Sequence, residues 1–221
     1  MENRIMVALD VADAREALML RQQLIGAVGW LKVGLRLFVA EGPSLIAALQ
    51  RDHRIFLDLK FHDIPNTVQQ AVESAGKLGV DMVNVHAAGG MAMLQAAAVA
   101  AKQYHGMKLI AVTVLTSTKT NKNTEQNVLE RAVLAKEAGL DGVVSSVHEV
   151  AAIKNSCGEN FITVTPGIRW ALNSADDQAR VATPKDAVLA GADYLVIGRP
   201  IVQAKNPAKA ASEVVAMMKS V

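Results

Sequence analysis

The chain has 221 residues, of which 51% are hydrophobic and only 4% aromatic, so aliphatic side chains must fill most of its core. Its net charge is +2 with acidic and basic residues interspersed, which argues against a nucleic-acid or membrane-surface partner. This length suits a compact α/β domain, and because no linker or charge block divides the chain, we expect one domain over residues 1–221.

The single cysteine, Cys157, excludes an intramolecular disulfide and suits a reducing cytosol. The N-terminal residues lead directly into an apolar run, without the basic, apolar and small-residue segments of a secretory leader. The most apolar stretch, residues 87–101, is too short and too rich in Gly and Ala for a transmembrane helix. We therefore expect a cytoplasmic protein with an inert thiol.

Short apolar runs alternate with helical patterns along the chain. The predicted strands are residues 5–10, 30–35, 55–61, 82–87, 109–115, 142–147, 161–166 and 194–198. The predicted helices are residues 13–25, 42–51, 65–78, 90–103, 125–138, 148–155, 184–190 and 207–219. Strands separated by helices pair in parallel, and eight such units can close into a (β/α)₈ TIM barrel. An open doubly wound sheet is the alternative, but no Gly-x-Gly-x-x-Gly opens a helix after the first strand.

Two connections are longer than a barrel requires. They are residues 116–124 and residues 167–183, and both follow predicted strands. The loops after the strands of such a barrel lie at its C-terminal face, where active sites are built. Long loops in compact domains are commonly functional, so the pattern places the site at that face.

Charged residues interrupt the first three strands. Strand side chains alternate faces, so Asp58 and Lys60 share a face with Phe56, at about 6.6 Å from each other along the strand. Asp10 ends the first strand and Lys32 lies within the second. A structural ion pair is the simpler interpretation of one such pair, but four charges in adjacent strands favour a functional site because burying them is costly.

Lys32, Asp58, Lys60 and the following Asp63 form a series of alternating charge. At about 4 Å and an effective dielectric near 20, each opposite pair is worth about 4 kcal/mol before desolvation. Such a series suits a reaction that develops carbanion charge and needs a proton at the same carbon, with Lys60 as the general acid. Schiff-base formation by Lys60 needs a neutral amine, which flanking carboxylates oppose.

A second set of residues suits a phosphate group. The segments 165–169 and 196–200 end the seventh and eighth predicted strands, where barrels of this kind commonly bind phosphate. Gly198 allows backbone N–H groups to approach an anion, and Arg199 offers a bidentate guanidinium. The alternative is a Gly-Arg-Pro turn with a solvated arginine.

The run Asp-Leu-Lys-Phe-His-Asp-Ile-Pro-Asn-Thr at residues 58–67 resembles the signature of the orotidine 5′-phosphate decarboxylase family. The resemblance extends from Asp10 to Arg199. It implies a cofactor-free enzyme that converts orotidine 5′-monophosphate to uridine 5′-monophosphate and carbon dioxide, the last step of UMP synthesis. In that family the residue matching Lys60 protonates C6 of the pyrimidine, and the one matching Asp58 lies near the substrate carboxylate.

The resemblance also assigns substrate contacts and a partner. Asp10 and Lys32 match residues that hold the ribose hydroxyls. The family enzymes are homodimers with shared active sites, to which the partner subunit contributes the residues that match Asp63, Ile64 and Thr67 here. The remaining family matches are Thr116 for the pyrimidine, Gln178 for the phosphate, and the binding residues Arg169, Gly198 and Arg199.

Other interpretations share parts of this pattern. A magnesium-dependent sugar-phosphate decarboxylase of the keto-gulonate type has the same Asp-x-Lys-x-x-Asp spacing, but Ile-Pro-Asn-Thr at 64–67 with Gln178 favours the nucleotide enzyme. A ribulose-phosphate epimerase would want a metal ligand in place of Lys60. A non-catalytic phosphate-binding barrel would not need the charge series.

No His-x-His or His-x₃-His pattern occurs, so we expect no bound metal. We interpret His62 as a structural residue, and His86 as either a core residue or a site residue.

Overall fold

Eight parallel strands form a closed barrel in the computed structural model, which describes residues 1–115, 123–170 and 181–221. Each strand pairs with the next, and β1 also pairs with β8. The strands are β1 (Ile5–Ala8), β2 (Trp30–Gly34), β3 (Arg54–Phe61), β4 (Met82–His86), β5 (Lys108–Val112), β6 (Gly142–Val144), β7 (Ile162–Thr165) and β8 (Tyr194–Ile197). The predicted (β/α)₈ barrel is confirmed and the open sheet is excluded.

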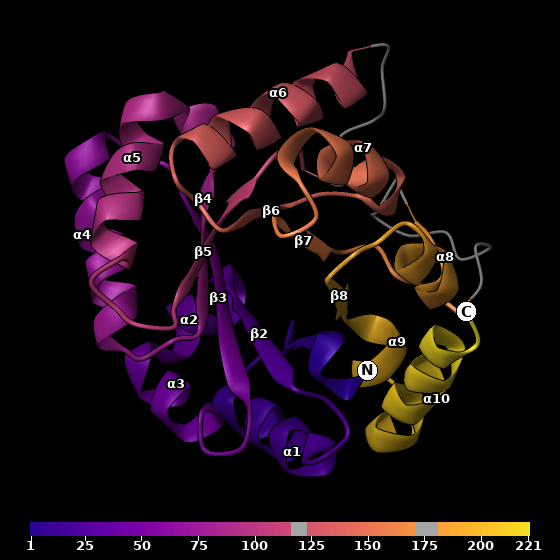
Figure 1. Ribbon diagram of the computed structural model, residues 1–221. Helices are drawn as coiled ribbons and strands as arrows, with labels where there is room; N and C mark the ends of the chain where they lie inside the picture. Colours follow the sequence, from indigo (N-terminus) through magenta and orange to yellow (C-terminus); the bar gives the residue numbers. More distant parts are fainter. Residues whose placement is uncertain (116–122, 171–180) are drawn as a thin grey trace.

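Helices surround this barrel in chain order, as the colour sequence around the ring shows (Figure 1). They are α1 (Ala14–Leu24), α2 (Leu35–Glu41), α3 (Pro43–Leu49), α4 (Pro65–Lys77), α5 (Gly90–Ala101), α6 (Thr124–Glu137), α7 (Val147–Cys157), α8 (Pro184–Leu189), α9 (Arg199–Val202) and α10 (Pro207–Lys219), with 3₁₀ turns η1 (Glu2–Arg4) and η2 (Ala87–Gly89). Because α1 packs against α10, the two ends of the chain lie on the same side of the barrel.

The structure adds two helices that the sequence pattern did not predict. The predicted helix at 42–51 is α3 alone, and α2 precedes it directly after β2. Gly42 separates the two at φ 67°, a left-handed conformation that glycine adopts without strain, and its N–H caps α2 at the carbonyl of Phe38. The short α9 was also missed, so Arg199 begins a helix rather than ending a strand.

The apolar core has two layers, separated by the barrel wall. Inside the barrel lies a cluster of eight buried side chains: Met6, Ala8, Trp30, Phe56, Met82, Ile110, Val164 and Val196. The neighbouring strand residues, such as Ile5 and Val7 of β1, point outward and pack under the helices. Each fully buried aliphatic side chain contributes about 1.5–3 kcal/mol. The inner cluster therefore forms an apolar floor, and Lys32 and Asp58 follow it along β2 and β3 toward the C-terminal ends of the strands.

The alternation expected for residues 55–61 is broken within β3. Leu57 pairs with Val83 and Phe61 with Val85, so three residues of β3 lie opposite one residue of β4. Lys60 lies at this bulge with φ 53°, the one positive φ of a non-glycine residue in the described part of the chain. Bulges of this kind redirect side chains and occur beside active sites. The shared face of Asp58 and Lys60 thus depends on a bulge and not on a regular strand.

Among the described residues no helix is both long and apolar enough to cross a membrane. The thiol of Cys157 is buried, and this burial raises its pKa, which agrees with the expected low reactivity. That residues 1–221 form a single domain stays a prediction.

Candidate active site

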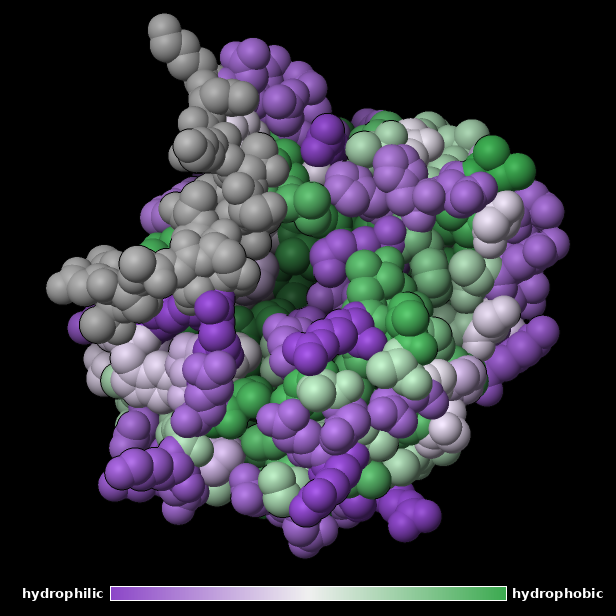
Figure 2. All heavy atoms as spheres, turned by 180° about the vertical axis from the view of Figure 1, so that it is seen from behind, coloured by the Kyte–Doolittle hydropathy of each residue, from purple (hydrophilic) through white to green (hydrophobic). Residues whose placement is uncertain are grey.

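A pocket of about 380 Å³ opens among residues at the C-terminal ends of the strands. Its lining residues are Ala8, Asp10, Lys32, Phe56, Asp58, Lys60, Val112, Val114, Leu115, Val144, Val164, Pro166, Gly167, Arg169, Val196, Gly198, Arg199 and Gln203. Figure 2 shows a hollow near the centre of the molecule with hydrophobic residues at its floor and hydrophilic residues along its right side. The predicted face therefore carries a pocket, and most of the predicted residues line it.

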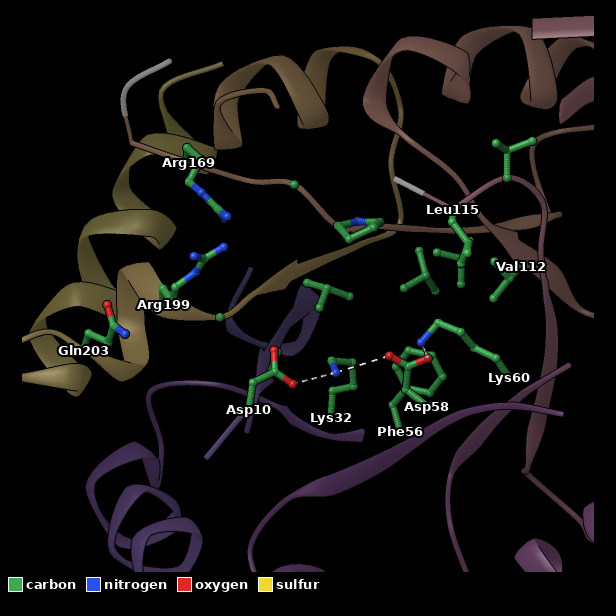
Figure 3. Close-up of a pocket in the computed structure, with 18 residues that line it drawn as sticks. Asp10, Lys32, Phe56, Asp58, Lys60, Val112, Leu115, Arg169, Arg199 and Gln203 are labelled. Carbon is green, nitrogen blue, oxygen red and sulfur yellow. Dashed lines mark hydrogen bonds and ion pairs between the residues drawn. The ribbon is translucent and has the colours of Figure 1, made fainter. Parts of the chain in front are cut away.

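A continuous series of ion pairs runs along one wall of the pocket (Figure 3). Lys32 Nζ lies 3.3 Å from Asp10 Oδ1 and 3.2 Å from Asp58 Oδ2. Lys60 Nζ lies 2.6 Å from Asp58 Oδ1. Both oxygens of the Asp58 carboxylate are thus engaged by ammonium groups, one from β2 and one from β3.

Burial and charge act in opposite directions on the central pair. Lys32 and Asp58 are only 8% and 9% exposed. Burial disfavours both ionised forms, but the charges of Asp58 and Asp10 outweigh it and raise the pKa of Lys32. For Asp58, burial is likewise outweighed, by Lys32, by Lys60 and by hydrogen bonds, so that the pKa of its carboxyl is lowered. Both groups stay charged at neutral pH.

Two glycines lie directly beside this series. A Cβ at Gly34 would lie 3.2 Å from Lys32 Nζ and 3.5 Å from Asp10 Oδ1, so a side chain there would crowd the ion pair. A Cβ at Gly198 would lie 3.7 Å from Asp10 Oδ2. Gly198 therefore belongs to the pocket wall beside Asp10 and is also the N-cap residue of α9.

Two arginines lie at the opposite end of the pocket. Their guanidinium groups point toward each other from the segment after β7 and from the start of α9 (Figure 3). Arg169 is 8% exposed and donates to the carbonyl of Ile168 at 2.9 Å, whereas Arg199 is exposed. Gln203, one helical turn after Arg199, also lines this end and was missed in the sequence, where it has the pattern of an ordinary surface residue. Two convergent guanidiniums make this end of the pocket cationic, which suits an anionic group.

An apolar wall accompanies the charged groups at the other end. Val112 and Leu115 lie near Lys60 in Figure 3, and Val144 and Val164 also line the pocket. None of these residues was singled out in the sequence, because valines at strand ends look like ordinary core. One end of the pocket is thus cationic. At the other end, one side carries the charged residues and the facing side is apolar.

Several predicted site residues lie outside this pocket in the single chain. Asp63, Ile64 and Thr67 are exposed, and Asp63 Oδ1 accepts a hydrogen bond from the neighbouring N–H of Ile64 at 2.7 Å. The chain alone therefore does not bring Asp63 to the other three charged groups. Thr116 and Gln178 lie outside the described residues.

His62 of the signature stacks on His86 of β4, with ring centroids 5.3 Å apart and planes 18° from parallel. His62 is exposed, and His86 at the end of β4 accepts a hydrogen bond from the N–H of Ala88. Burial, followed by the charges of His62, Arg131 and Lys60, lowers the pKa of His86. Neither ring lines the pocket.

The family model "Orotidine 5'-phosphate decarboxylase / HUMPS family" matches residues 3–214. The chain belongs to this family. A Legionella pneumophila protein named orotidine 5′-phosphate decarboxylase is 53% identical over 218 residues, covering 94% of this chain and 95% of that protein. One of the same name from Moorella thermoacetica is 47% identical over 236 residues, covering 100% and 94%.

Membership of the orotidine 5′-phosphate decarboxylase / HUMPS family extends to three dimensions. The crystal structure of orotidine 5′-phosphate decarboxylase from Lactobacillus acidophilus superposes with a TM-score of 0.84 at 34% sequence identity. The match covers 98% of this chain and 99% of that one. The resemblance found at residues 58–67 therefore reflects kinship over nearly the whole barrel, and the family prediction is confirmed.

The lowered pKa of Asp58 predicts a specific acid dependence of stability. The unfolded carboxyl takes up its proton near pH 3.8 and the folded one only at lower pH. The unfolded state thus binds more protons in this range, so the contribution of Asp58 is complete above about pH 5 and declines as pH falls. We expect Asp58→Asn to lose about 3 kcal/mol at pH 7, with the deficit shrinking toward pH 3 in urea titrations.

Asp141→Asn is the matched control, because Asp141 pairs with Lys108 at 2.9 Å in an ion pair whose side chains are 32% and 45% exposed. Exposed pairs are worth about 0–1 kcal/mol, so this variant should lose far less stability at pH 7. A deficit for Asp58→Asn that stays constant from pH 7 to pH 3 would contradict the assigned ion pairing.

Proposed function

We propose that this chain decarboxylates orotidine 5′-monophosphate to uridine 5′-monophosphate and carbon dioxide without a cofactor. One observation carries the proposal: a single pocket holds two convergent guanidiniums at one end and the Asp58–Lys60 pair beside an apolar wall at the other. A nucleotide has the same polarity, with a phosphate at one end and a base at the other. The names of the relatives support the same substrate.

In the proposed mechanism Lys60 is the general acid. As the bond from C6 to the carboxylate breaks, its electron pair stays on C6, and the Lys60 ammonium transfers a proton to that carbon. Lys60 leaves the step as a neutral amine and regains its proton from water. The fixed charges of Lys32 and Asp58 need no reorganisation during the step, which is the source of electrostatic catalysis.

Asp58 lies next to the position proposed for the substrate carboxylate. Its 2.6 Å contact with Lys60 keeps that ammonium directed at the reacting carbon. The apolar wall formed by Val112, Leu115 and Val144 offers a place for uncharged carbon dioxide but no hydrogen bond to a carboxylate. The site is thus better suited to bind neutral carbon dioxide than to bind the negatively charged carboxylate of the substrate.

The remaining contacts are assigned from the family likeness, and the lining of the pocket is compatible with them. We assign the ribose hydroxyls to Asp10 and Lys32, which lie between the two ends, and the phosphate to Arg169, Gly198 and Arg199. Gln178 for the phosphate and Thr116 for the pyrimidine complete the assignment from the family likeness. A cytoplasmic enzyme fits the single buried thiol of Cys157.

The proposed enzyme is a homodimer with shared active sites. Asp63, Ile64 and Thr67 are exposed directly after the strand that carries Asp58 and Lys60, and Ile64 is 66% exposed despite its apolar side chain. A second copy of the chain would cover this segment and bring Asp63 into its partner's pocket as the fourth member of the charge series. The fourth charge is thus proposed to come from the other subunit.

The competing functions predict different chemistry at Asp58. A magnesium-dependent sugar-phosphate decarboxylase needs carboxylate oxygens for the metal, but both Asp58 oxygens face ammonium groups at 2.6 and 3.2 Å. A barrel that only binds a phosphorylated ligand has no use for the buried charges near the apolar wall. Both rivals therefore predict no orotidylate turnover in the presence of a chelator.

Orotidylate turnover, followed by absorbance in EDTA, tests the reaction directly. We expect the wild type to turn over and Lys60→Ala to lose at least about 1,000-fold in kcat, because it lacks the general acid. Binding of uridine 5′-monophosphate should persist in this variant. The exposed Lys77, at the end of α4, supplies the control Lys77→Ala with unchanged kcat. An inactive wild type would refute the proposed function, and an active Lys60→Ala variant would refute the role of Lys60.

The phosphate assignment predicts that Arg199→Ala raises KM for orotidine 5′-monophosphate by at least about 100-fold, the worth of a charge-assisted bidentate contact. The same variant should use the phosphate-free nucleoside as poorly as the wild type does. Arg51→Ala is the matched control, because Arg51 is exposed in the loop before β3 at the other end of the barrel. Equal KM values for wild type and Arg199→Ala would refute the assignment of the substrate phosphate to this site.

The shared site predicts complementation between two inactive variants. In a dimer of Lys60→Ala with Asp63→Ala, one site carries both changes and the other carries neither, because a two-fold interface exchanges identical segments. A refolded equal mixture should therefore regain about a quarter of wild-type activity, since about half of the dimers are mixed and half of their sites are intact. No recovery in mixed dimers verified by mass would place Asp63 outside its partner's site.

A further inference from the structure

Asn84 lies in the middle of β4, with 0% of its side chain exposed, opposite the bulge of β3. Leu57 pairs with Val83 and Phe61 with Val85, so Asn84 alone faces residues 58–60. An extra residue in a bulge is left without its regular ladder partner. The backbone groups of β3 at this bulge therefore need a hydrogen-bond partner that the regular pairing with β4 does not supply.

The Asn84 amide provides that group and also contacts the charge series. Its Oδ1 accepts the backbone N–H of Lys60 at 2.8 Å, and its Nδ2 donates to Asp58 Oδ1 at 2.6 Å. Reversing the amide would set donor against donor at Lys60 and acceptor against acceptor at Asp58. The two partners thus specify one orientation of the amide, and that amide holds both of them.

The backbone conformation of Lys60 depends on contacts such as its hydrogen bond to Asn84. Its φ of 53° is rarely adopted by residues with a side chain, and surrounding contacts must maintain it. The Lys60 side chain then turns back to Asp58, with Nζ on the same Oδ1 atom that Asn84 contacts. Asn84 therefore holds the lysine at its backbone and the carboxylate at the atom where the ammonium binds.

We propose that Asn84 is a positioning residue for the decarboxylation, which fixes the Lys60 backbone and the Asp58 carboxylate together and so sets where the Lys60 ammonium delivers its proton. This inference rests on the proposed function. Asn84 does not line the pocket, so it acts on the reaction through its two neighbours. Loss of the amide should therefore affect the chemical step and leave substrate binding at the arginine end intact.

Asn84→Ala removes both hydrogen bonds, whereas Asn84→Asp keeps an acceptor for the Lys60 N–H and loses the donor to Asp58. We expect kcat for orotidine 5′-monophosphate to fall about 100-fold in Asn84→Ala, with KM nearly unchanged, because small misplacements of a catalytic group have effects of this size. Asn84→Asp should keep the positive φ of Lys60 in a crystal structure and still lose kcat, because two carboxyl groups then meet.

Thr163→Ala is the control for merely structural damage. Thr163 is a buried polar residue of β7 that also binds a carboxylate, Asp193 Oδ2, at 3.0 Å, but its partners lie outside the pocket. This variant should lower the melting temperature and leave kcat unchanged. The contrast separates a role in positioning from a role in stability alone.

A folded Asn84→Ala variant with the kcat of the wild type overturns the proposal. If Asn84→Ala does not fold, a wild-type kcat in Asn84→Asp overturns it equally. If the wild type itself turns over no orotidylate, the proposed function fails, and crystal structures of the wild type and a folded Asn84 variant decide the positioning role. A changed Lys60 φ or a rotated Asp58 carboxylate then supports that role, and unchanged geometry refutes it.

Discussion

The site depends on one buried carboxylate whose two oxygens are each paired with a lysine. Asp58 is 9% exposed, and it tolerates this burial as an anion because Lys32 on the adjacent strand and Lys60 on its own strand neutralise it. Lys32 is in turn balanced by Asp10. Removing one member leaves a neighbouring charge buried without compensation, which costs far more than the pair contributes. The series therefore adds little net stability, which agrees with the role toward a substrate that we propose for it.

The barrel explains how these charges reach one place. Parallel strands bring their carboxyl ends to the same face, above an inner layer of apolar side chains that includes Met6 and Phe56. Strands on one side contribute the charge series, and the segments around Arg169 and Arg199 contribute two guanidiniums across the pocket. In the proposed function, phosphate binding at the arginines supplies free energy that holds the base against the charges.

Much of this arrangement could be predicted from the sequence, because charged residues in apolar strands are conspicuous and strand periodicity places Lys32 and Asp58 inside the barrel. The bulge at Lys60 could not be predicted from the sequence, since it arises from how β3 pairs with β4. The hydrogen-bond partners of Asn84 could not be predicted either, because a single asparagine in an apolar strand does not indicate which residues it contacts. Gln203 resembled a surface residue. The proposed place of Asp63 in a partner's pocket came from the family resemblance, because no contact within this chain brings it to the other charges.

A crystal structure with uridine 5′-monophosphate bound tests the central claim most directly. It should show the phosphate between the two arginines and C6 of the base within about 3.5 Å of Lys60 Nζ, with Asp58 still joined to both lysines. A base that lies away from Lys60, or a Lys32–Asp58–Lys60 series that separates when the nucleotide binds, would contradict the account.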